Sequence, residues 1–170
     1  MKYFFGAALA LALATSASAE AVKSEVTASN GVPVTVYADE FAARYEYSAP
    51  VVKASPCFAL VARVKRGTET SSVNLQGSCV YSGSWRFYSS AIFKGGAEAP
   101  FTSAGREVGS CRYGCTLTES FRIDLTPAQI KAHTENGIVA IQIRASKTGD
   151  TTILEVPTSY FAAVEEVSRK

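Results

Sequence analysis

The chain has 170 residues, of which 47% are hydrophobic, and its 17 basic and 15 acidic side chains leave a formal net charge of +2. A chain so close to neutral lacks the basic excess that attracts nucleic acid or anionic lipid, so we expect neither as a partner. The length is that of a single domain with enough interior for a hydrophobic core.

The N-terminal residues have the pattern of a bacterial export signal. Lys2 precedes a short apolar run over residues 4–14, and Ala17-Ser18-Ala19 is a small-residue cleavage site. The run is too short to span a bilayer as a helix, and no later stretch approaches that length. We therefore expect a signal peptide over 1–19, one domain over 20–170, and a periplasmic or secreted protein without a transmembrane segment after cleavage.

After the signal, most segments have the composition and the period of β-strands. Asn30-Gly31 is a hairpin-turn signal between residues 22–28 and the β-branched run 32–37. Residues 41–47 also fit a helix capped by Asp39, but their alternation of aromatic and polar side chains favours a strand. Further strands are expected at residues 57–65, 73–81, 85–93 and 119–125, with a closing hairpin formed by 138–145 and 151–156.

Two short helices are expected near the C-terminus. Thr126-Pro127-Ala128-Gln129 has the residues of a capping box, and Asn136-Gly137 supplies a stop signal. A last helix is expected over 159–167. The mainly β pattern predicts an antiparallel β-sandwich of about eight strands with one or two short helices, and an open β-barrel is the alternative.

Four cysteines in an exported chain are expected to form disulfides. Cys57 and Cys79 lie at equal distances from a turn centred near Gly67-Thr68, so a hairpin places them opposite one another. Cys111 and Cys115 are close enough in the sequence for a local bridge. Three residues separate them, whereas redox-active pairs use two, so we interpret this bridge as structural. The predicted disulfides are Cys57–Cys79 and Cys111–Cys115.

The apolar pattern of residues 57–65 makes a conflicting prediction about the core face. Four hydrophobic side chains alternate there and are expected to point inward together: Phe58, Leu60, Ala62 and Val64. That arrangement turns Cys57 to the opposite face from Cys79, because neighbouring residues of a strand point in opposite directions. A β-bulge near Gly77 would reconcile the two predictions.

The segment 108–119 (VGSCRYGCTLTE), with the capped helix and the closing hairpin after it, resembles the C-terminal part of the invasion-associated locus B proteins. Those are secreted bacterial β-proteins with a closely spaced cysteine pair before their last strands. The resemblance is limited to this part of the chain, and we assign no family from it.

No motif for catalysis or metal binding is found in the sequence. His133 is the single histidine and lies on the expected capped helix, and there is no Gly-x-Ser-x-Gly elbow for a hydrolase nucleophile. One histidine with four oxidised cysteines does not make a zinc site. We therefore expect no metal and no cofactor.

The best candidate for ligand binding is the aromatic segment 81–88 (YSGSWRFY). If Trp85 and Phe87 face the core, Arg86 and Tyr88 project outward beside Tyr81 and form a platform for a sugar or peptide. A second displayed pair lies in the predicted Cys111–Cys115 loop. The candidate ligand-binding residues are therefore Tyr81, Trp85, Arg86, Tyr88, Arg112 and Tyr113.

These patterns predict an exported bacterial binding or accessory protein that recognises a protein or glycan partner in the cell envelope without catalysing a reaction. One alternative is a hydrolase of envelope polymers, which would need two carboxylates facing each other across a cleft. The other alternative is a purely structural component of the envelope.

Overall fold

The computed structural model describes residues 21–109, 111 and 114–170. The predicted signal peptide and two candidate ligand-binding residues, Arg112 and Tyr113, lie outside the described residues.

The described part of the chain forms mostly β-strands, with two helices in its C-terminal third. The elements are β1 (Val22–Thr27), β2 (Pro33–Asp39), β3 (Arg44–Ser48), β4 (Val52–Ala54), β5 (Cys57–Arg66), β6 (Glu69–Thr70), β7 (Asn74–Ser82), β8 (Tyr88–Phe93), β9 (Glu98–Ala99), β10 (Phe101–Val108), β11 (Thr116–Ile123), α1 (Pro127–Ala132), β12 (Thr134–Glu135), β13 (Ile138–Ala145), β14 (Thr151–Pro157) and α2 (Thr158–Arg169).

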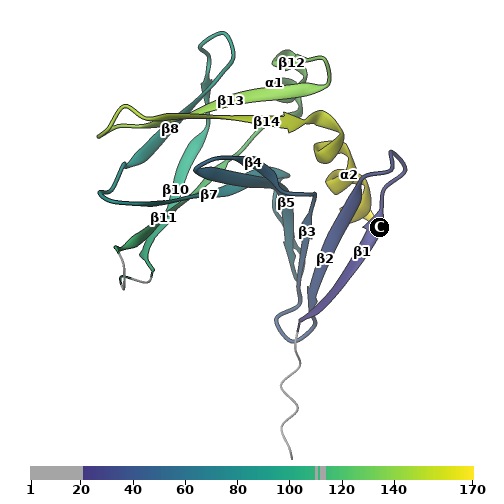
Figure 1. The fold of residues 1–170 in the computed structure, drawn as a ribbon. Helices are drawn as coiled ribbons and strands as arrows, with labels where there is room; N and C mark the ends of the chain where they lie inside the picture. The colour runs from purple at the N-terminus through teal and green to yellow at the C-terminus, as the bar shows by residue number, and fades with distance from the viewer. Residues whose placement is uncertain (1–20, 110, 112–113) are drawn as a thin grey trace, which may run out of the picture.

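Two antiparallel sheets pack against each other, which confirms the predicted β-sandwich. Sheet A has the order β1-β2-β3-β5-β7-β11-β10, and the short strands β4 and β6 also pair with β5. In sheet B, β13 pairs with β14, β8 and β12, and β9 extends the sheet beyond β8. Figure 1 shows that sheet A is strongly curved, with sheet B crossing one part of it. Helix α2 covers another part, where it contacts β2, β3 and β5.

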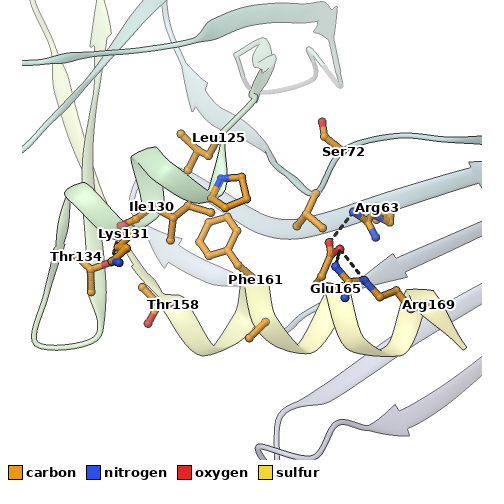
Figure 2. Close-up of a pocket in the computed structure, with 13 residues that line it drawn as sticks. Arg63, Ser72, Leu125, Ile130, Lys131, Thr134, Thr158, Phe161, Glu165 and Arg169 are labelled. Carbon is orange, nitrogen blue, oxygen red and sulfur yellow. Dashed lines mark hydrogen bonds and ion pairs between the residues drawn. The ribbon is translucent and has the colours of Figure 1, made fainter.

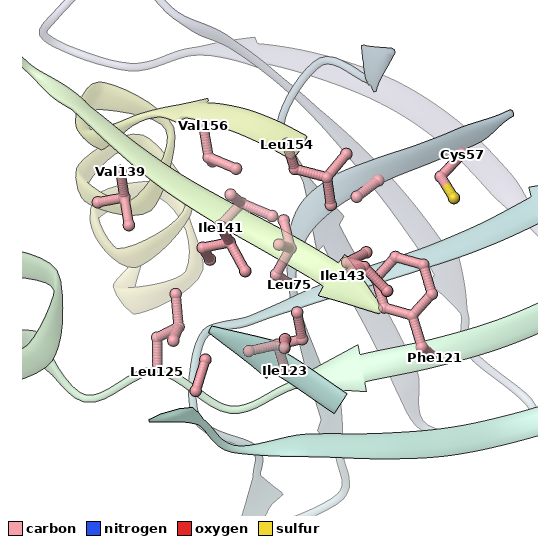
Figure 3. Close-up of a cluster of buried hydrophobic side chains, with 14 of the residues drawn as sticks. Cys57, Leu75, Phe121, Ile123, Leu125, Val139, Ile141, Ile143, Leu154 and Val156 are labelled. Carbon is pink, nitrogen blue, oxygen red and sulfur yellow. The ribbon is translucent and has the colours of Figure 1, made fainter. Parts of the chain in front are cut away.

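The hydrophobic core lies between the two sheets and under α2. Alternate residues of β13 point inward, as expected for a strand with one buried face: Val139, Ile141 and Ile143 are fully buried. Leu75 and Phe121 from sheet A meet them in the same cluster (Figure 3). Neither helix of the described residues is long and apolar enough to cross a bilayer.

Several local predictions are confirmed. β1 and β2 form the hairpin at Asn30-Gly31, where Gly31 has a φ of 80°. Thr126 and Gln129 form the capping box of α1. That helix is shorter than expected because Asn136-Gly137, with φ values of 50° and 77°, makes the hairpin turn between β12 and β13. An Asn-Gly pair with two positive φ angles is the preferred turn of a tight hairpin, and it does not stop a helix here.

Both predicted disulfides are present, Cys57–Cys79 and Cys111–Cys115. Cys57 lies directly opposite Cys79 in the pairing of β5 with β7. The prediction that Phe58, Leu60, Ala62 and Val64 together form the core face is wrong for three of them, and Ala62 alone of the four is buried. The inward side chains of β5 include Cys57, Ala59 and Val61, whereas Phe58 is 40% exposed.

The small residues Ala59 and Gly77 explain why this face of β5 and β7 lies inward. They are opposite each other in the pairing, and the ring of Phe121 fills the space above them. A Cβ atom on Gly77 would lie only 2.4 Å from Cζ of Phe121. The pairing of β7 with β5 and with β11 is continuous through Gly77, so the register conflict is solved without a bulge.

Candidate functional site

The predicted aromatic platform is largely an interior feature. Tyr81 and Tyr88 have only 7% and 2% of their surface exposed, so the expectation that Tyr88 projects outward is wrong. Trp85 and Arg86 are half-buried. The cause is Phe87, whose φ of 59° lies in the left-handed region and interrupts the strand alternation on which the expectation depended.

A buried carboxylate holds this segment in place. Glu119, on β11, is 2% exposed and accepts the backbone N–H groups of Phe87 at 2.9 Å and of Tyr88 at 3.2 Å. The hydroxyl of Tyr81 donates to the same carboxylate, and Nε of Arg106 donates to it at 3.1 Å. A buried charge is stable only when it is paired and hydrogen-bonded, and Glu119 meets both conditions.

The same contacts shift two pKa values. Burial alone would raise the pKa of Glu119, but the hydrogen bonds from Tyr81, Arg106 and the two backbone amides outweigh burial and lower it. Burial, together with the hydrogen bond to Glu119, raises the pKa of Tyr81 to about 12. Glu119 is therefore an ionised structural anchor at neutral pH, and Tyr81 is its neutral donor.

The outer side of the aromatic segment is covered by the protein's own cations. The guanidinium of Arg106 lies 4.7 Å from the ring centre of Phe87, and Nζ of Lys147 lies 5.5 Å from it. Arg86 lies 4.4 Å over the ring of Tyr81 and also pairs with Asp150 at 3.3 Å. These internal contacts occupy aromatic faces that a ligand would need.

A different feature, which the sequence interpretation did not find, is a groove between α1 and α2 (the α1–α2 groove). This groove is open on one side, has a volume of about 770 Å³ and is shown in Figure 2. Residues from β5, from the segments before β7 and before α1, from β12 and from both helices line it: Arg63, Ser72, Val73, Leu125, Pro127, Ile130, Lys131, Thr134, Thr158, Phe161, Ala162, Glu165 and Arg169.

The lining of the α1–α2 groove is mostly apolar. Leu125 and Phe161 belong to the buried core, and Ile130 of α1 is partly buried and packs against that core. None of the residues of α1 is fully buried, so this helix forms a wall of the groove instead of closing onto α2. A space of this size with an apolar lining and a few polar groups is typical of small-molecule sites, which enclose about 300–1,000 Å³.

Charged side chains mark the ends of the α1–α2 groove. Near one end, Nη2 of Arg63 lies 2.5 Å from Oε2 of Glu165, and Nη2 of Arg169 lies 2.6 Å from Oε1 of the same carboxylate. Lys131 lies toward the other end, beside Thr134 (Figure 2). Arg63 and Glu165 are far apart in the sequence, and only the packing of α2 on β5 brings them together.

His133 has a packing role in the structure. Its ring stacks on Phe93 with 4.0 Å between the ring centres. It lines a second hollow of about 530 Å³, where Lys94 pairs with Glu135. Among the described residues, no group of three or more histidine, cysteine, aspartate or glutamate side chains is placed to hold a metal ion.

Comparison of the chain with protein-family models, with curated proteins and with solved structures found no match.

Proposed function

We propose that this chain is an exported binding protein that holds an apolar small molecule in the α1–α2 groove. The observation that carries this proposal is the groove itself, with about 770 Å³ of space between two helices and an apolar lining built on Leu125, Ile130 and Phe161. We place the binding site in this groove and not at the aromatic segment, because Glu119, Arg86, Arg106 and Lys147 already contact Tyr81 and Phe87 there.

Export is supported by the two disulfides and by the predicted signal peptide. Disulfides persist in oxidising spaces such as the bacterial periplasm and are rare in the cytosol. The Cys57–Cys79 bridge joins the two central strands β5 and β7, and Arg63 of β5 lines the groove. The bridge lies at the start of β5, away from Arg63, so it stabilises the sheet that carries this groove residue and does not act at the groove itself.

The expected affinity follows from the area that a ligand would bury. An apolar body that removes about 300 Å² from water gains about 7 kcal/mol, part of which is lost to the cost of association. The proposal therefore predicts dissociation constants between the micromolar and the millimolar range for simple apolar ligands.

A neutral, environment-sensitive dye such as N-phenyl-1-naphthylamine tests the proposal by its fluorescence. Ala162 is exposed and lines the α1–α2 groove, so Ala162→Trp fills the groove without disturbing the core. The matched control is Ala132→Trp, at an exposed alanine of α1 that does not line the groove. We expect the wild type and the control to bind the dye and Ala162→Trp to lose at least about tenfold in affinity. Equal binding by all three proteins would disprove the proposal.

A further inference from the structure

The charged end of the α1–α2 groove indicates which kind of head group a ligand would have, whereas the apolar lining indicates only an apolar body. Arg63 extends from β5, and Glu165 and Arg169 lie one turn apart on α2. Figure 2 shows the three side chains meeting beside the apolar part of the groove that contains Phe161. Two guanidinium groups share a single carboxylate, so this cluster has a net charge of +1.

Arg63 is the most enclosed member of the cluster, with 13% of its side chain exposed. Its Nη1 donates to Oγ of Ser168 at 3.1 Å and its Nη2 pairs with Glu165. Its Nε is buried and has no hydrogen-bond partner within the described part of the chain. That atom is closed to solvent and therefore to a ligand, so Arg63 would act on a ligand at this end of the groove mainly through its positive charge.

The side chain of Arg169 is less constrained than that of Arg63. Its side chain is 73% exposed, and the hydrogen bonds that hold it go to Glu165 of the preceding turn. An exposed ion pair within a helix is worth only a few tenths of a kcal/mol, so the guanidinium of Arg169 can turn toward a ligand at little cost. Glu165 then remains as the counterion of Arg63.

We infer that the α1–α2 groove selects an amphipathic acid, with its apolar body along Phe161 and Ile130 and its carboxylate or phosphate at Arg169 and Arg63. The inference rests on the proposed function, since it specifies the head group of the ligand bound there. One negative charge on the ligand balances the net positive charge of the cluster. Arginine suits the role because its planar donors match both a carboxylate and a phosphate.

Three amphiphiles with the same apolar chain test the inference: dodecanoic acid, dodecyl phosphate and dodecanol. Each is titrated against the bound neutral dye, with calorimetry as a second measurement. We expect the acid and the phosphate to bind at least about tenfold more tightly than the alcohol, because a hydrogen bond to a charged group contributes that much. The ratio of the two acids then shows which head group the cluster prefers.

Variants locate the preference within the groove. Arg169→Gln changes an exposed residue and should remove most of the preference for acids while leaving the affinity for dodecanol unchanged. Glu165→Gln removes the competing carboxylate and should strengthen acid binding. Arg122→Gln is the control, because Arg122 pairs with Asp124 and neither residue lines the groove. Arg63→Gln should also lose the preference, and thermal unfolding shows whether this more buried variant still folds.

The outcomes separate the inference from the proposed function. Two outcomes would overturn the inference while the proposed function stands. The first is equal affinity for dodecanol and dodecanoic acid. The second is binding of the dye that none of the three amphiphiles displaces. A preference that survives in both arginine variants but is lost in Lys131→Gln would also overturn it, because the head group would then lie at the other end. Failure of the dye and of all three amphiphiles to bind would overturn the inference and the proposed function together.

Discussion

The carboxylate of Glu119 accepts the backbone N–H of Phe87 at 2.9 Å, and this contact ties β11 of sheet A to the segment that leads into β8 of sheet B. A left-handed backbone at a residue with a large side chain costs about 1–3 kcal/mol and persists only where the surroundings impose it. At Phe87 the surroundings are the Glu119 carboxylate and the cations of Arg106 and Lys147, which both approach the ring. Glu119 is thus a structural residue at the junction of the two sheets.

Replacement of Glu119 by Gln should lower the free energy of unfolding by about 3 kcal/mol or more. The glutamine keeps one acceptor oxygen but places an NH₂ group against donors, and it leaves Arg106 without its partner. Urea denaturation of the variant measures the effect. Asp124→Asn is the control, since that carboxylate is 36% exposed and pairs with an exposed arginine, and it should change stability by less than about 0.5 kcal/mol. Similar values for the two variants would show that Glu119 is not an anchor.

The lowered pKa of Glu119 predicts a loss of stability in acid. A carboxyl group with a pKa below its ordinary value of 4.5 stabilises the folded state above that pH. This contribution disappears as the pH falls through the pKa of the folded state. The melting temperature of the wild type should therefore fall more steeply below about pH 4.5 than that of Glu119→Gln, and parallel curves for the two proteins would contradict the assignment.

Gly77→Ala should destabilise the fold by about 1–3 kcal/mol. The added Cβ would lie 2.4 Å from both Cζ of Phe121 and the carbonyl oxygen of Phe58, and the backbone oxygen cannot move without disturbing the sheet. Gly109→Ala provides the comparison, because the nearest atom there is at 3.5 Å. Thermal unfolding of both variants measures the difference. A Gly77→Ala protein as stable as Gly109→Ala would mean that the inner face of β7 is not packed as described.

Loss of the Cys57–Cys79 bridge should cost about 3 kcal/mol, and loss of Cys111–Cys115 about 2 kcal/mol, in the loop-entropy model. The difference arises because the first bridge closes a loop with a sequence separation of 22 and the second one of 4. Paired Cys→Ala variants at each bridge, compared by denaturant unfolding, measure both values. A larger decrease in the free energy of unfolding for the variant without Cys111 and Cys115 would contradict the loop-entropy model.

Features that depend on neighbouring residues could be predicted from the sequence. The Asn30-Gly31 hairpin, the capping box at Thr126 and the closing β13–β14 hairpin depend on backbone preferences within a few residues. Cys57 and Cys79 could be paired because equal distances from one turn determine the register of a hairpin. Asn136-Gly137 could be recognised as a turn from the sequence, but not as the turn of a hairpin. That role depends on β12, which is a strand only because β13 pairs with it.

By itself, the amino-acid sequence determined the β-rich class, the disulfide pairs and the local turns, because each of these follows from short-range geometry or from symmetry about a turn. Only the tertiary structure decided which face of β5 lies in the core, since that depends on the fit of the Phe121 ring over Gly77. The same holds for the candidate site. Arg63, Leu125 and Phe161 meet in one groove because α2 packs on β5 beside α1, and no periodicity within a single segment encodes contact over such distances along the chain.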